Sequence, residues 1–223
     1  MFDAFFRINS MLARDIDARW TLQPQAMIDL ALERWQIDVE DTIYRFHDTL
    51  ARESAQHVLK MRGQKNDDLE LLMNLLRPQL RQYSVQRASL IRSFLEQRIN
   101  AELASGRTPM QVRQNIFSIL SSRDRVLRVA RTEAHTAFER GAWEAANSFG
   151  VRMQKEWVSR EDARVRLPHA LANGQVREID DFFVVGGENL LYPGDPRASA
   201  RNNVNCRCTV IYRLVGVGDG TNA

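Results

Sequence analysis

The sequence has few of the residues that would support a disulfide scaffold or a membrane span. Two cysteines in 223 residues exclude a disulfide framework, and Cys206 and Cys208 are too close in sequence for an easy mutual bridge, so reduced thiols are expected. No apolar run approaches the length needed to cross a bilayer, and Met1–Phe6 lacks the basic start and apolar middle of a signal peptide. We therefore expect a protein that stays in the cytoplasm where it is made, with no membrane partner.

Lysine is also scarce. It occurs only at Lys60, Lys65 and Lys155, so all other members of the 31 basic residues are arginines. Arginine forms bidentate contacts with phosphate and carboxylate, which suits a protein that works among charged macromolecules. The same bias arises from a GC-rich genome, and 28 acidic residues reduce the net charge to +3. Composition alone therefore does not indicate specific nucleic-acid recognition.

The common catalytic fingerprints are absent: there is no GxSxG, HExxH, P-loop or Rossmann motif. Asp162, His169 and Glu188 are residue types that a hydrolase uses, but no spacing forces them together. Residues 131–133, Arg-Thr-Glu, are similar to the Arg and Glu motifs of ADP-ribosyltransferases over three residues only. We expect no enzyme and no catalytic residues, with a metal-dependent or transferase-like activity as the least favoured alternative.

Apolar periodicity predicts a long helical hairpin at the start of the chain. One helix is expected from Gln25 to about Arg62, beginning after Pro24 and ending at Gly63. A second is expected from Asp68, with a kink at Pro78. The apolar residues of the two helices recur at steps of three and four or near heptad spacing. They are Ile28, Leu32, Trp35, Val39, Ile43, Phe46 and Leu50 in the first helix, and Leu69, Leu72, Leu76, Leu80, Tyr83, Leu90, Phe94 and Ile99 in the second.

Two further helices are predicted. Thr108 and Pro109 cap and begin a short one, and a longer one runs from about Asp124 to Phe149 and ends at Gly150. Small residues along the longer helix, among them Gly141, allow close helix approach. The side chains expected to be buried by the short helix are those of Met110, Val112, Ile116, Ile119 and Leu120. Residues 1–22 have an irregular apolar pattern that fits either a short helix or a docking arm.

The pattern changes between Lys155 and Tyr212. Short β-branched or aromatic runs, such as Val184-Val185 and Thr209–Tyr212, are separated by glycine and proline turns, which indicates hairpins. The fold class expected is therefore α+β: a long helical N-terminal region, made of the hairpin and two further helices, followed by a small antiparallel β-containing C-terminal unit.

This C-terminal unit contains the candidate metal ligands. Cys206 and Cys208 offer two thiolates and His169 an imidazole, a donor set that suits zinc. Three ligands are one fewer than a structural zinc site needs. The alternative is that both cysteines are small buried residues and that His169 is hydrogen-bonded.

Arginines supply the candidate nucleic-acid contacts. Phosphate binding would need them to form one exposed patch. Asp162, Arg164 and Arg166 alternate as on one face of a short extended segment. In the interpretation that we favour, Arg164 pairs with Asp162 or another acid and holds the loop. The candidate contact residues are Arg125, Arg128, Arg131, Arg164, Arg166 and Arg207.

The order of motifs in this unit is distinctive. A D-x-R-V-R-x-x-H segment begins at Asp162 and is followed by Gly174, by Y-P-G-D-P from Tyr192 and by N-C-R-C from Asn205. In this order the motifs resemble the phage head morphogenesis family, the Mu F-like minor head proteins of tailed bacteriophages. The resemblance covers roughly residues 131–212.

The resemblance implies a minor head (capsid) protein that acts in head assembly near the portal. The implied partners are the portal protein, other capsid proteins and packaged viral DNA, and the implied location is the virion head at the portal vertex. A non-specific nucleic-acid-binding packaging or ejection factor is the alternative. Some relatives carry cysteines where this chain has Arg166 and His169, so it keeps part of a possible zinc pattern. The implied domains are a helical docking region, 1–122, a Mu F-like head morphogenesis domain, 123–215, and a flexible tail, 216–223.

Overall fold

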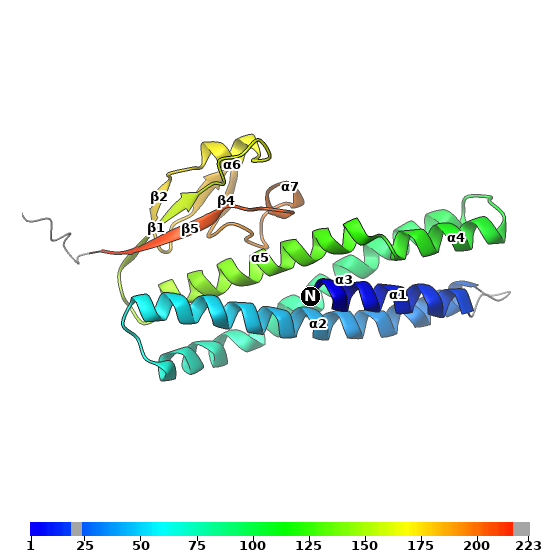
Figure 1. The fold of residues 1–223 in the computed structure, drawn as a ribbon, viewed down its shortest axis with the longest axis horizontal. Helices are drawn as coiled ribbons and strands as arrows, with labels where there is room; N and C mark the ends of the chain where they lie inside the picture. Colours follow the sequence, from blue (N-terminus) through cyan, green and yellow to red (C-terminus); the bar gives the residue numbers. More distant parts are fainter. Residues whose placement is uncertain (19–23, 216–223) are drawn as a thin grey trace, which may run out of the picture. The chain divides into compact units, whose positions relative to one another are not determined.

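The computed structural model describes residues 1–18 and 24–215, and its fold class is α+β, as predicted (Figure 1). The predicted flexible tail, 216–223, lies outside the described residues. Among the described residues, no helix is both long and apolar enough to span a membrane. The helices are α1 (Phe2–Ala18), α2 (Pro24–Met61), α3 (Asn66–Leu103), α4 (Pro109–Leu120), α5 (Arg123–Asn147), α6 (Leu167–Leu171) and α7 (Ala200–Asn203). The strands are β1 (Met153–Val158), β2 (Val176–Glu178), β3 (Phe183–Val185), β4 (Glu188–Leu190) and β5 (Thr209–Leu214).

The chain divides into two compact units that interleave along the sequence. Unit 1 combines Met1–Phe46 with Pro78–Ala130, and unit 2 combines His47–Arg77 with Arg131–Ala223. The helices α2, α3 and α5 therefore each contribute to both units. The predicted division at residues 122 and 123 into a docking region and a head morphogenesis domain stays a prediction.

The predicted hairpin is formed by α2 and α3. Within unit 2, Arg52 pairs with Glu70 at 2.5 Å and Arg77 pairs with Asp48 at 3.0 Å. Because later residues of one helix meet earlier residues of the other, the two helices run antiparallel. The turn between them uses Gly63 at φ 70°, a left-handed conformation that glycine adopts without strain.

Unit 1 has an apolar core formed by α1, α4 and parts of α2, α3 and α5. Three side chains predicted on apolar faces are instead exposed: Met110 (68%), Leu90 (63%) and Phe94 (48%). On α3 the buried line passes through the small residues Ser84 and Ala88, which leaves Leu90 and Phe94 on the outer side. The main core residues are Phe5, Leu12, Ile16, Ile28, Leu32, Trp35, Val39, Ile43, Leu95, Ile99, Val112, Ile116, Leu120 and Val126.

The helices of unit 2 approach closely at Gly141. A Cβ atom at this position would lie 2.3 Å from the backbone oxygen of Ala51 and 2.4 Å from the hydroxyl oxygen of Ser54. The buried face of α2 therefore passes through these two small residues, and Phe46 and Leu50, which were predicted on the apolar stripe, are only half-buried. Small residues on α5 thus allow close packing, as expected.

Two small antiparallel sheets complete unit 2. One has the strand order β2-β1-β5 (Figure 1). In the other, β3 pairs with β4. In the first sheet Trp157 lies opposite Val210. Along β1 the side chains of Met153, Lys155 and Trp157 are buried on one face. The core of this unit contains Trp157, Ala172, Phe183, Val185, Leu190, Tyr192, Cys206, Cys208 and Val210.

A buried carboxyl group lies between α5 and β5. Burial raises the pKa of Glu139 to about 8, and a hydrogen bond with the Thr209 side chain opposes this rise. Glu139 is 3% exposed, and the same polar region includes Tyr212, whose buried hydroxyl oxygen has no hydrogen-bond partner among the described residues. The neutral form of Glu139 is therefore favoured in the folded chain at neutral pH.

We predict that replacing Gly141 by alanine destabilises unit 2. The added methyl group would overlap the Ala51 backbone, which costs about 1–3 kcal/mol as overpacking and outweighs a helix-propensity gain of about 1 kcal/mol. The measurement is the free energy of unfolding in urea, with Gln114→Ala at an exposed helical position as the control. A Gly141→Ala variant as stable as the parent would contradict the close approach.

We also predict a pH-dependent gain of stability for Glu139→Gln. A carboxyl group in the unfolded chain releases its proton at about pH 4.3, whereas folded Glu139 keeps it up to about pH 8. The folded state therefore binds more protons across this window, and stability falls as the pH rises through it. Relative to the parent, the variant should gain on the order of a few kcal/mol between pH 5 and pH 9. Exposed Glu161→Gln is the control, and unfolding profiles of parent and Glu139→Gln that stay parallel across this range would refute the prediction.

Candidate metal centre

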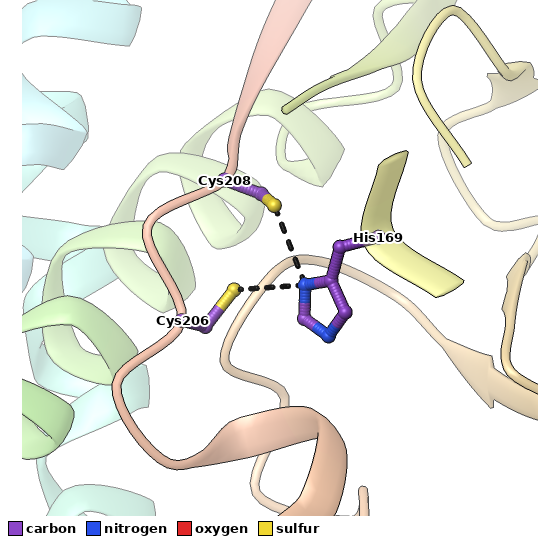
Figure 2. A group of neighbouring side chains, drawn as sticks. All are labelled: His169, Cys206 and Cys208. Carbon is purple, nitrogen blue, oxygen red and sulfur yellow. Dashed lines mark hydrogen bonds between the residues drawn. The ribbon is translucent and has the colours of Figure 1, made fainter. Parts of the chain in front are cut away.

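The structure brings together the three predicted metal ligands. His169 lies on α6, and Cys206 and Cys208 lie on the loop between α7 and β5 (Figure 2). The Nδ1 atom of His169 is 3.6 Å from the Sγ atom of Cys206 and 3.4 Å from that of Cys208. All three side chains are buried, and their ligand atoms lie within 4.8 Å of one another. The cluster has the composition and the compactness of a partial zinc site.

The two thiols have different electrostatic surroundings. A hydrogen bond with Cys208, together with burial, raises the pKa of Cys206, while His135 and His169 act in the opposite direction. The hydrogen bond with Cys206 lowers the pKa of Cys208 despite its burial, helped by Trp157. Cys208 is therefore the thiol that more readily forms a thiolate, which is the form that binds metals.

Aromatic side chains surround the cluster on the sheet side. The ring of Trp157 meets the His169 ring edge-on at a centroid distance of 5.8 Å, and it meets Phe183 in the same way at 5.3 Å. The Nε1 atom of Trp157 and the Nε2 atom of His169 are buried, and neither has a hydrogen-bond partner in the part of the chain that the structure describes. The site thus contains buried polar groups whose hydrogen bonding is incomplete among the described residues.

The cysteine loop is attached to one face of α5. The hydroxyl oxygen of Thr132 accepts a hydrogen bond of 3.1 Å from the backbone N–H of Asn205, the residue before Cys206. Asn205 has φ 54°, a left-handed conformation that asparagine tolerates better than most residues. One turn along α5, Thr136 donates a hydrogen bond of 2.9 Å to the carbonyl of Gly194. Both bonds fix loops of the C-terminal unit to the helix.

Gly194 also makes room for His135. A Cβ atom on Gly194 would lie 2.9 Å from Cδ2 of His135, so only glycine fits beside the imidazole without displacing it. Gly194 has φ 80°, which also favours glycine. Two physical constraints therefore favour glycine at this position of the Y-P-G-D-P motif: the left-handed backbone of the turn and the closeness of His135.

A polar network fixes the rest of the Y-P-G-D-P turn. Asp195 is 1% exposed, accepts a hydrogen bond of 2.9 Å from the N–H of Leu191 and pairs with Arg197. The ammonium group of Lys155 donates to the carbonyl of Leu191 at 2.8 Å and lies 5.1 Å from the centroid of the Phe183 ring. Burial lowers the pKa of Lys155 to about 8. A lysine in a strand is normally expected to face solvent. The sequence therefore contained no signal that Lys155 is buried and bonded to the carbonyl of Leu191.

Asp162 pairs across the loops with Arg207. Two guanidinium nitrogens of Arg207 contact the two carboxylate oxygens, one at 2.7 Å, and the hydrogen bond from Arg207 is the main reason that the pKa of Asp162 falls to about 2. The backbone N–H of Arg164 also donates to Asp162, at 2.9 Å. An ion pair thus holds this loop, but the partner of Asp162 is Arg207 rather than the predicted Arg164. It connects the start of the D-x-R-V-R motif to the centre of N-C-R-C.

The other candidate residues are divided between the two units. Arg125 donates to the carbonyl of Ile119 at 3.0 Å in unit 1, and Arg166 donates to the carbonyl of Arg201 in unit 2. Arg128 and Arg131 are exposed and belong to units 1 and 2, respectively. The nucleic-acid contacts of these arginines, and those of Arg164 and Arg207, stay a prediction.

The residues considered for a hydrolase or transferase have separate structural partners. Glu188 accepts hydrogen bonds from the backbone N–H and the hydroxyl group of Ser199, at 2.8 and 2.6 Å. Glu133, from the Arg-Thr-Glu segment, lies 3.3 Å from His47, and both side chains are fully buried. His169 faces the two cysteines. The polar groups are therefore used for packing and loop attachment.

Comparisons with known proteins relate the C-terminal half of the chain to a phage protein family. The family model described as "Phage Mu protein F like protein" matches residues 94–211. The chain is also similar to "Minor head protein GP7" of Bacillus phage SPP1, with 31% identity over 136 residues, which is 59% of this chain and 43% of that protein. The chain thus spans less than half the length of this relative. No solved structure matches this chain. Because the family model covers more than half of the chain, the chain belongs to the family of phage Mu protein F like proteins.

Proposed function

We propose that the chain is a minor head protein of a tailed bacteriophage that acts in head assembly near the portal vertex. The observation that carries the proposal is the family match over residues 94–211, together with the similarity to a protein named as a minor head protein. In this proposal the portal protein and other capsid proteins are its partners, and its location is the virion head.

Exposed apolar side chains on α3 support a docking role. Leu75 is 65% exposed in unit 2, and Leu90 is 63% exposed in unit 1. In unit 1, Val85, Ser89 and Leu90 also line an open surface groove. Apolar helix faces of this kind bind helices or grooves of partner proteins. We assign these α3 positions to the contact with the portal protein.

The contacts of the motifs support a structural rather than an enzymatic role. Asp162, Asp195 and Glu188 each hold a loop through a hydrogen bond or ion pair. Catalysis needs several polar groups that converge on one reacting atom, and these three carboxylates have separate protein partners. We therefore propose that the protein acts by assembly, with no chemical step.

Contact with packaged DNA is a further part of the proposal. Arg131 and Arg164 are exposed and would contact phosphates. The pairing of Arg207 with Asp162 reduces what Arg207 contributes to such a contact. Any DNA affinity is therefore expected to be non-specific and to fall steeply with salt.

The test is sedimentation velocity of the purified chain mixed with the portal protein of the same phage. We expect co-migration at a few copies per portal ring. Leu75→Asp and Leu90→Asp should each weaken the association about tenfold or more, since burying a charge in an apolar contact is costly. Leu171→Asp is the matched control, because Leu171 on α6 is 75% exposed and lies outside the assigned surface.

Sedimentation of the chain alone at every concentration, together with a shift on addition of DNA, would overturn portal docking and favour the packaging or ejection factor. Equal weakening by Leu171→Asp would reject the assignment to α3 while leaving the portal as the partner.

A further inference from the structure

The two distances from the His169 nitrogen to the cysteine sulfurs match those around a tetrahedral zinc ion. With bonds of about 2.3 Å to sulfur and about 2.0 Å to nitrogen, tetrahedral geometry separates a sulfur from a nitrogen ligand by about 3.5 Å. The two distances from Nδ1 of His169 to the thiol sulfurs are 3.4 and 3.6 Å. The imidazole nitrogen and each of the two sulfurs therefore already have the separation that a metal would impose, although direct hydrogen bonds would give similar distances.

Three ligands leave a structural zinc site one short, and the surroundings contain a suitable fourth. His135 lies on α5 between Thr132 and Thr136, the two residues that hold the cysteine loop and the Gly194 turn. Its imidazole is close enough to Cys206 to influence the thiol, and its Nε2 atom is buried with no hydrogen-bond partner in the described part of the chain. A histidine beside a thiol, with a buried nitrogen that has no partner among the described residues, is an available ligand.

We propose that Cys206, Cys208, His169 and His135 bind one zinc ion as a tetrahedral Cys₂His₂ centre, with His135 as the fourth ligand. His135 is not part of the group whose ligand atoms lie within 4.8 Å of one another, so its imidazole turns toward the other three when zinc binds. Two thiolates and two imidazoles favour zinc over magnesium or calcium, which prefer oxygen ligands.

The surroundings fit this centre in two further ways. The side chain of Trp157 and the backbone of Arg160 both favour the charged form of Cys208, and groups of this kind stabilise a metal-bound thiolate. The absence of a side chain at Gly194 leaves room for the His135 ring. A zinc ion here would join α5 to α6 and the cysteine loop, which are distant in sequence. Its binding energy would therefore contribute to the folding of unit 2.

The inference does not depend on head assembly, and its test measures metal binding directly. The full chain, purified without chelator, is expected to contain one zinc per molecule by elemental analysis. Its zinc X-ray absorption should fit two sulfur and two nitrogen ligands. Replacing zinc by cobalt should produce thiolate charge-transfer bands and the visible bands of tetrahedral cobalt.

Single substitutions test the role of His135 separately from the roles of the other three ligands. Zinc affinity, measured by competition with a chelator, should fall about 100-fold or more for Cys206→Ser, Cys208→Ser and His169→Ala, and at least about tenfold for His135→Gln. His57→Ala is the matched control, because His57 is an exposed histidine in the same unit. Circular dichroism checks that each variant is folded.

Two results would overturn the proposal. Absence of stoichiometric zinc from the parent chain, with no cobalt spectrum on reconstitution, would refute the metal centre. An unchanged affinity for His135→Gln, or an absorption fit with only one nitrogen ligand, would refute His135 as the fourth ligand. The absorption measurement uses the parent chain, so it decides the second point even if His135→Gln does not fold.

Discussion

The C-terminal unit depends on two hydrogen bonds made by one face of α5. Thr132 accepts from the N–H of Asn205, and Thr136 donates to the carbonyl of Gly194. These bonds fix two loops that are far apart in the chain, and His135 lies between them at the cysteines. Because both hydroxyl groups are buried, losing either partner would leave a polar group unsatisfied, which costs about 1–3 kcal/mol.

The motifs singled out in the sequence therefore have structural explanations. In D-x-R-V-R, Asp162 binds Arg207 of N-C-R-C. In Y-P-G-D-P, Asp195 binds the backbone of Leu191 and Gly194 fits against α5. Each motif thus contacts another element that helps to hold it in position. The proposed zinc centre lies where these contacts converge and would hold the same loops.

The sequence predicted the long helices well and the polar interior poorly. Steps of three and four residues located α2 almost to the residue, because a helix must keep its apolar face on one side. The same periodicity placed Leu90 and Phe94 on the buried side, because it does not reveal that Ser84 and Ala88 lie on the packed line. His135 is 71 positions from Cys206, and no local spacing connects the two.

The attachment of the cysteine loop to α5 is tested most directly by amide hydrogen exchange at Asn205. Our account predicts that this amide is protected in the parent chain and that Thr132→Val, which keeps the side-chain shape, accelerates its exchange about tenfold. The amide of Trp157, bonded to the carbonyl of Gln175 at 2.9 Å, should be unchanged and is the internal control. Equal exchange of the Asn205 amide in parent and variant would contradict the account.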